Sequence, residues 1–263
     1  MTMKIGISTA CLYPMLLEDS TLLLLKSGVK NLEVFFNTDS EISPVYIKEM
    51  QKNFAEYGAN CVSIHPYTCG MESMMLFGVY ERRVGDFLEY YKKFFSAGNV
   101  LGAKYFVLHG NNSKFKVEKN LYFERFLRLC ETAEKFGITV LQENVSLYDS
   151  ARLDFRLAMK EAIGAEFVLD IKQCIRAGED PIENILKLGS SVKHIHFSDH
   201  DDDSDCKLIG KGKFDVQYFL QILEKQGYQG TLMLELYRHN YGEVDELVEN
   251  YVYLKQLINA IHT

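Results

Sequence analysis

Eight short apolar runs alternate with amphipathic stretches of helical period along this chain. The runs are rich in Val, Ile, Leu and Phe, which is typical of strands covered on both faces. They lie at 4–8, 31–36, 59–65, 104–109, 138–143, 166–170, 192–197 and 230–235. Eight strand–helix units within 263 residues match the usual size of a closed (β/α)8 TIM barrel. The pattern therefore predicts an α/β fold of this type.

An open doubly wound sheet is the main alternative, but it normally has a Gly-rich turn after its first strand. Here that turn is STACLYPM, without the G-x-G-x-x-G pattern. The chain also contains no linker, low-complexity tract or break in composition. We therefore expect residues 1–263 to form one barrel domain.

Composition limits the partners and the location. The formal charge of −7 argues against broad electrostatic binding of a nucleic-acid backbone. The six cysteines form no C-x-x-C pair, and the longest aliphatic cluster, TLLLLK, is too short to span a bilayer. We expect a cytoplasmic protein that binds neither nucleic acid nor membranes. An aromatic stretch leaves room for a homo-oligomer; its members are Phe87, Tyr90, Tyr91, Phe94 and Phe95.

Four of the later runs each deliver one polar side chain at the C-terminal end. These are Glu143, Asp170, His196 and Glu235. Parallel strands bring such residues together at the C-terminal mouth of a barrel, where catalytic residues of this fold lie. Three carboxylates and an imidazole in one pocket require compensation of their charge and desolvation, which a divalent cation provides. An oxygen-rich set with one nitrogen suits Mn2+, Mg2+ or Co2+, and Zn2+ is an alternative.

For each of these residues alone, a helix N-cap or an ion pair is the more frequent role. Their joint occurrence at four strand ends favours a metal site. His65 and His109 end two earlier runs and would either complete a second metal site that shares Glu143 or contact the substrate. Glu33, inside the second run, would reach the pocket floor or form a buried ion pair.

The motifs VSIHPY, VLHG, LQEN, VLDI, HIHFSD, IGKGKFD and MLELY, in this order, resemble the xylose isomerase-like TIM barrels. That family includes sugar and sugar-phosphate isomerases and epimerases together with endonuclease IV-type enzymes. The resemblance implies a metal-dependent isomerase or epimerase of carbohydrate metabolism. Its substrate would be a small sugar, ketose or sugar phosphate. Glu143 and Glu235 would serve both as metal ligands and as the acid/base pair that moves a proton through a metal-stabilised ene-diolate.

Departures from the family pattern keep other functions open. Gln173 stands where relatives usually have a metal-binding histidine, and it is suited to a substrate hydroxyl instead. Ser204-Asp205-Cys206 replaces the Asp-x-His that endonuclease IV uses for its third zinc. Abasic-site DNA cleavage is therefore disfavoured. An inosose dehydratase-like lyase and a non-catalytic sugar-binding barrel also remain alternatives.

Two basic residues in the predicted mouth loops are candidate substrate contacts. Lys211 lies in IGKGKFD, and Arg238 follows the last strand by three residues. Each could recognise a phosphate or carboxylate. A solvated loop charge is the alternative for both.

Overall fold

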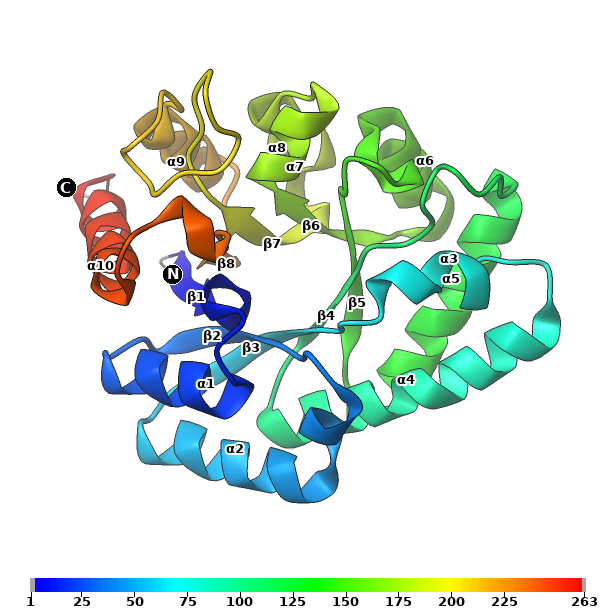
Figure 1. Ribbon diagram of the computed structural model, residues 1–263. Helices are drawn as coiled ribbons and strands as arrows, with labels where there is room; N and C mark the ends of the chain where they lie inside the picture. Colours follow the sequence, from blue (N-terminus) through cyan, green and yellow to red (C-terminus); the bar gives the residue numbers. More distant parts are fainter. Residues whose placement is uncertain (1–2, 262–263) are drawn as a thin grey trace.

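Eight parallel strands form a closed barrel (Figure 1). In the computed structural model, which describes residues 3–261, each strand pairs with the next one along the chain and β8 pairs with β1. The strands are β1 Lys4–Ser8, β2 Asn31–Phe35, β3 Asn60–His65, β4 Tyr105–Leu108, β5 Thr139–Glu143, β6 Glu166–Asp170, β7 Val192–Phe197 and β8 Thr231–Leu234. The predicted (β/α)8 barrel is thereby confirmed, with each strand within one residue of its expected ends.

Helices surround the barrel (Figure 1). They are α1 Leu17–Lys26, α2 Pro44–Glu56, α3 Cys69–Met75, α4 Glu81–Leu101, α5 Lys119–Glu134, α6 Leu153–Ile163, α7 Ile171–Ala177, α8 Pro181–Leu188, α9 Val216–Lys225 and α10 Val244–Ile261. Gly102 ends α4 with φ 77°, a left-handed conformation that glycine adopts without steric cost. None of the helices formed by residues 3–261 combines the length and apolar character that a membrane crossing requires.

The strand register brings the predicted polar residues to the barrel mouth. Asp170 at the end of β6 pairs with His196 on β7, and Glu143 ends β5 one strand further round. Side chains alternate along a strand, so Leu141 and Glu143 share one face. Leu141 and Val168 belong to a small buried cluster inside the barrel, which supports the polar residues above it.

The aromatic residues of α4 pack against the barrel. The rings of Tyr91 and Phe95 each lie 5.1 Å from that of Phe106 on β4. Phe87 and Phe94 are also buried, and only Tyr90 of the five is partly exposed. Four of the five rings therefore belong to the intramolecular core and are not free to form a dimer contact, and the homo-oligomer stays a prediction.

Candidate metal centre at the barrel mouth

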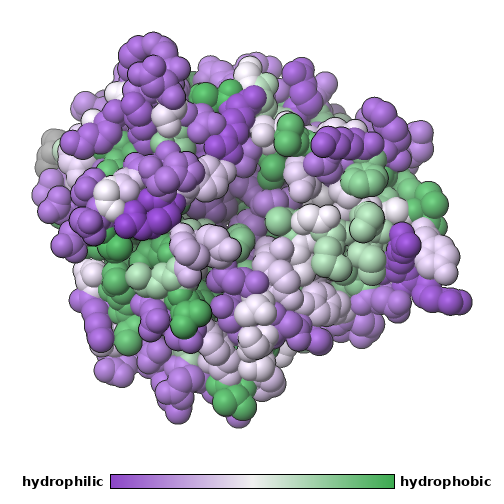
Figure 2. All heavy atoms as spheres, in the orientation of Figure 1, coloured by the Kyte–Doolittle hydropathy of each residue, from purple (hydrophilic) through white to green (hydrophobic). Residues whose placement is uncertain are grey.

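A cavity of about 510 Å3 opens at the mouth of the barrel. Figure 2 shows the molecule as space-filling atoms, with a hollow near the centre of this face. Acidic and imidazole side chains line one part of the cavity, and Tyr13, Phe35, Tyr67 and Tyr237 line another. A volume of this order is typical of sites for small molecules.

The four predicted ligands converge in this region. Glu143, Asp170, His196 and Glu235 each offer an atom, and these atoms all lie within 4.8 Å of one another. His196 Nδ1 lies 3.2 Å from Glu143 Oε1, 3.2 Å from Glu235 Oε2 and 3.6 Å from Asp170 Oδ2. The strand-end pattern therefore does bring the four side chains to one place, as expected.

Asp170 performs two tasks with its two oxygens. Oδ1 accepts the backbone N–H of Gln173 at 3.0 Å and so caps the N-terminus of α7. Oδ2 faces His196 and the ammonium of Lys172. The N-cap and the ligand interpretations of this residue are therefore compatible.

A buried network beneath the cluster fixes the orientation of His196. Glu33 Oε2 lies 3.1 Å from His196 Nε2 and 3.1 Å from His194 Nε2. Glu33 also accepts hydrogen bonds from the hydroxyls of Ser63 at 2.7 Å and Ser8 at 3.1 Å. With Nε2 held by this carboxylate, Nδ1 is directed toward the mouth, which is the arrangement by which a carboxylate positions a metal-binding histidine.

His65 and His109 lie on the other side of Glu143. Their Nε2 atoms are 3.0 Å apart, and His109 Nε2 is 3.0 Å from Glu143 Oε2. The three side chains form a second group that could hold a cation. Glu143 thus faces His196 with one oxygen and His109 with the other, so the predicted sharing of this residue is sterically available.

The donor set fits a divalent metal ion. Glu143 Oε2 is buried and has no hydrogen bond of good geometry, although His109 Nε2 lies 3.0 Å from it. Such an atom costs free energy unless a partner compensates it. Three carboxylates and one imidazole nitrogen are also ligand types that Mn2+, Mg2+, Co2+ and Zn2+ accept. The residues that would hold the ion are Glu143, Asp170, His196 and Glu235.

Burial and neighbouring charges act in opposite directions on the pKa values of the cluster. Burial acts to raise the pKa of Glu143, but His109, His196 and His65 hold it well below its usual value. Burial acts to lower the pKa of His196, and Glu235 and Glu33 outweigh it and raise that pKa. Burial raises the pKa of Asp170 despite the opposing charge of Lys172.

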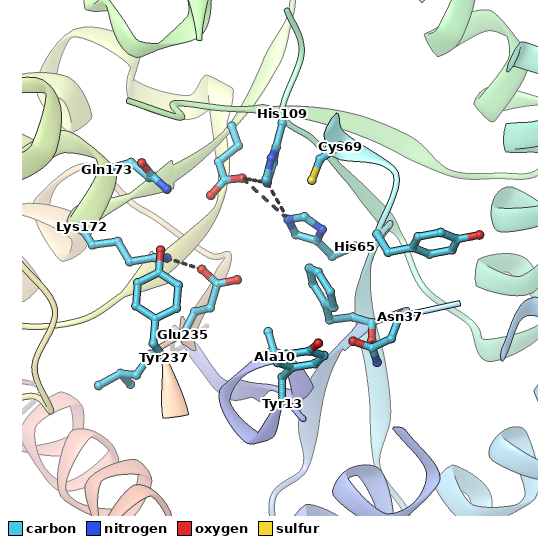
Figure 3. Close-up of a pocket in the computed structure, with 14 residues that line it drawn as sticks. Ala10, Tyr13, Asn37, His65, Cys69, His109, Lys172, Gln173, Glu235 and Tyr237 are labelled. Atoms are coloured by element: carbon cyan, nitrogen blue, oxygen red, sulfur yellow. Dashed lines mark hydrogen bonds and ion pairs between the residues drawn. The ribbon is translucent and has the colours of Figure 1, made fainter. Parts of the chain in front are cut away.

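Lys172 is a part of the centre that the sequence did not reveal. This second residue of α7 is 4% exposed, and its ammonium contacts both Asp170 Oδ2 and Glu235 Oε2. Figure 3 shows Lys172 and Glu235 pointing toward one another, with His65 and His109 across the cavity. Burial acts to lower the pKa of Lys172, but the two carboxylates hold it well above its usual value.

Of the three predicted substrate contacts, Gln173 lines the cavity, whereas Lys211 and Arg238 do not. Gln173 lines the cavity, and its Oε1 accepts the backbone N–H of Ser146 at 3.1 Å. The structure does not bring Lys211 or Arg238 to the cavity. Lys211 is exposed, and Arg238 donates to the backbone carbonyls of Tyr241 and Gly242.

Glu72 on α3 is another residue that sequence reasoning missed. Its Oε2 accepts the backbone N–H of Gly110 at 2.5 Å, and its Oε1 accepts the hydroxyl of Tyr91 at 2.9 Å. It therefore ties α3 to the segment that follows β4, next to His109. Burial raises the pKa of this carboxyl to about 7.

Fold and site together define a parallel α/β barrel with a carboxylate-rich centre at its mouth. The chain belongs to the xylose isomerase-like TIM barrel family, whose profile matches residues 23–257. The family resemblance expected from the motifs is thereby confirmed.

Individual relatives are distant. An uncharacterised protein of Methanocaldococcus jannaschii is 27% identical over 199 residues, covering 72% of this chain and 76% of that protein. Fructoselysine 3-epimerase of Escherichia coli O157:H7 is 24% identical over 202 residues, with 72% and 73% covered. Among solved structures, a D-tagatose 3-epimerase-like protein has a TM-score of 0.82 at 18% identity, with 99% and 98% covered. L-Ribulose 3-epimerase has a TM-score of 0.80 at 15% identity, with 99% and 96% covered.

Proposed function

We propose that this chain is a divalent-metal-dependent epimerase or isomerase of a small ketose. The observation that carries the proposal is that Glu143 and Glu235, which line a cavity of monosaccharide size, converge with the buried Asp170 and His196. The names of several relatives support it, because they include a fructoselysine 3-epimerase, a D-tagatose 3-epimerase-like protein and an L-ribulose 3-epimerase.

The two glutamates are the proposed acid/base pair. Epimerisation beside a carbonyl needs a base on one face of the substrate and an acid on the other. Glu143 comes from β5 and Glu235 follows β8, so they reach the cavity from different strands. We propose that Glu143 removes a proton from the carbon next to the carbonyl and that Glu235 returns one to the opposite face. The substrate passes through an ene-diolate.

Four residues of this chain are the proposed metal ligands: Glu143, Asp170, His196 and Glu235. When bound, the cation supplies positive charge beside the carbonyl and neighbouring hydroxyl oxygens of the substrate. Glu33 keeps His196 Nδ1 directed at the ligand set through its contact with Nε2. His65 and His109 orient Glu143 from its other side.

The cavity favours a sugar without phosphate. Among residues 3–261, Lys172 is the only lysine or arginine that lines it, so a phosphate would meet a single side chain of this kind there. Lys211 and Arg238 lie elsewhere. Aromatic residues such as Tyr13 and Phe35 instead offer apolar faces to the C–H groups of a sugar ring or chain.

The direct test is solvent isotope exchange. The purified protein, loaded with Mn2+, is incubated with a panel of free ketoses in D2O, and the products are analysed by NMR and mass spectrometry. We expect one deuterium on the carbon beside the carbonyl and a second sugar of the same skeleton. Absence of exchange across the panel contradicts the proposal. Loss of a water from the product identifies a lyase instead.

A further inference from the structure

The ammonium of Lys172 lies among the carboxylates of the proposed metal centre. Its ammonium contacts one oxygen of Asp170 and one of Glu235, and the side chain is almost fully buried. The same two oxygens, Asp170 Oδ2 and Glu235 Oε2, also face His196 Nδ1, at 3.6 Å and 3.2 Å. Lys172 therefore contacts two of the oxygen atoms that would bind the proposed metal ion.

An ammonium and a divalent cation that contact the same two oxygens repel each other. A lysine ammonium is a compact point charge that donates up to three hydrogen bonds. A metal ion bound at about 2.0–2.6 Å from the same oxygens would lie beside it with no screening water between them. Repulsion between two buried positive charges therefore disfavours occupation by both at once.

We propose that Lys172 is a built-in cation that competes with the divalent metal for Asp170 and Glu235. In this arrangement the centre is charge-compensated without a metal, and metal binding requires the ammonium to leave both carboxylates. Lys172 thus lowers the metal affinity of the site. This inference rests on the metal site of the proposed function and adds a residue that regulates it.

The surroundings of Lys172 provide a place for the displaced ammonium. Its Nζ lies 5.9 Å from the ring centre of Tyr237, and both side chains line the cavity together with Gln173. An ammonium that leaves the carboxylates therefore remains in the substrate cavity, close to an aromatic face that attracts a cation. There it is available to donate to a substrate oxygen.

Metal titration of single variants tests the competition. Full-length protein is stripped with a chelator, and free Mn2+ is followed by electron paramagnetic resonance during titration. We expect Lys172→Met to bind Mn2+ at least about tenfold more tightly than the wild type. Lys172→Arg, which keeps the charge, should bind no more tightly than the wild type. The control Lys193→Met removes an ammonium that pairs with Glu166 outside the cavity and should leave the affinity unchanged.

Equal or weaker Mn2+ binding by Lys172→Met overturns the proposal, as does an absence of binding in both proteins. A second measurement needs no variant. An amine-acetylating reagent is applied to wild-type protein with and without saturating Mn2+, and labelling is quantified by peptide mass spectrometry. We expect Mn2+ to raise labelling of Lys172 several-fold relative to Lys193. Unchanged or reduced labelling contradicts displacement.

Different results would contradict the proposed epimerase function and the proposed competition between Lys172 and the metal. Titration and labelling do not depend on turnover, so a protein that exchanges no deuterium with any ketose can still show competition between Lys172 and Mn2+. Conversely, deuterium exchange with no effect of Lys172→Met on metal affinity supports the epimerase and rejects the built-in cation.

Discussion

His196 presents Nδ1 to the mouth of the barrel because Glu33 holds its other ring nitrogen: Glu33 Oε2 lies 3.1 Å from His196 Nε2, and both side chains are buried. The relationship joins a residue on β2 to one on β7 across the barrel interior. It explains how a single imidazole keeps its orientation among three carboxylates. The buried carboxylate is therefore a positioning group for the proposed ligand.

Glu33→Gln tests this relationship. The glutamine amide is the same size as the Glu33 carboxylate but carries no charge. Its NH2 group would also face groups that donate hydrogen bonds to the carboxylate, so His196 loses its fixed orientation. We expect Mn2+ affinity to fall by about 10–100-fold, the usual effect of losing such a partner. The measurement is the Mn2+ titration, with circular dichroism to confirm folding. The control is Glu161→Gln at an exposed position of α6. Unchanged affinity in a folded Glu33→Gln protein removes the positioning role.

Glu235→Gln tests the acid/base assignment. The variant keeps an oxygen for contacts but cannot exchange a proton with substrate carbon. We expect the rate of deuterium incorporation to fall by at least about 100-fold. Ketose binding, measured by calorimetry with Mn2+ present, should persist. A variant that retains the wild-type exchange rate shows that another group moves the proton. A wild type that binds ketose and never exchanges it indicates a sugar-binding protein.

The buried Glu72 predicts a dependence of stability on pH. Its carboxyl has a pKa of about 7 in the folded protein against 4.5 without perturbation. Between these values the folded state holds a proton that the unfolded chain has lost, so the free energy of unfolding falls as pH rises through this window. Glu72→Gln has no titrating carboxyl at this position, so this fall in the free energy of unfolding should be absent. The free energy of unfolding of the variant, taken relative to that of the wild type, should therefore rise by on the order of 3 kcal/mol from pH 4.5 to pH 8.

Urea unfolding of both proteins at several pH values measures this difference. The absolute stability of Glu72→Gln reflects its altered hydrogen bonds to Gly110 and Tyr91, so the change with pH is the informative quantity. A constant difference between the two proteins from pH 4.5 to pH 8 is incompatible with a raised pKa at Glu72.

Phe94→Ala tests the aromatic core between α4 and the barrel. The fully buried ring lies 5.8 Å from that of Phe36 and 5.7 Å from that of Tyr91. We expect the free energy of unfolding to fall by about 3–5 kcal/mol. The exposed Val79→Ala should stay within about 0.5 kcal/mol of wild type. If Phe94→Ala instead changed the oligomeric state with little loss of stability, the ring would belong to an interface.

Much of the site could be predicted because the ends of the strands can be recognised in the sequence. An apolar run that stops at Glu143 or Asp170 fixes both the end of a strand and the residue placed there. Alternation along the strand then fixes which way its neighbours face. His194 lies on the same face of its strand as His196, is buried and contacts Glu33.

What could not be predicted depends on side-chain paths and loop conformations. A lysine at the second position of a helix resembles a solvated charge, and nothing in VLDIKQ indicates that Lys172 turns back to Asp170. Arg238 is close to Glu235 in sequence, but the turn after β8 directs its guanidinium to backbone carbonyls. Glu72 lies in a Met-rich segment whose pattern gave no sign of a buried carboxylate.

Glu143, Asp170, His196 and Glu235 are proposed to bind a divalent cation together. The most direct measurement is anomalous X-ray diffraction at the manganese edge from crystals of wild-type protein grown with Mn2+. We predict an anomalous peak within bonding distance of these four side chains, with the ammonium of Lys172 moved off Asp170 and Glu235. No anomalous peak among the four side chains at saturating Mn2+, or one only at another site, would contradict the account.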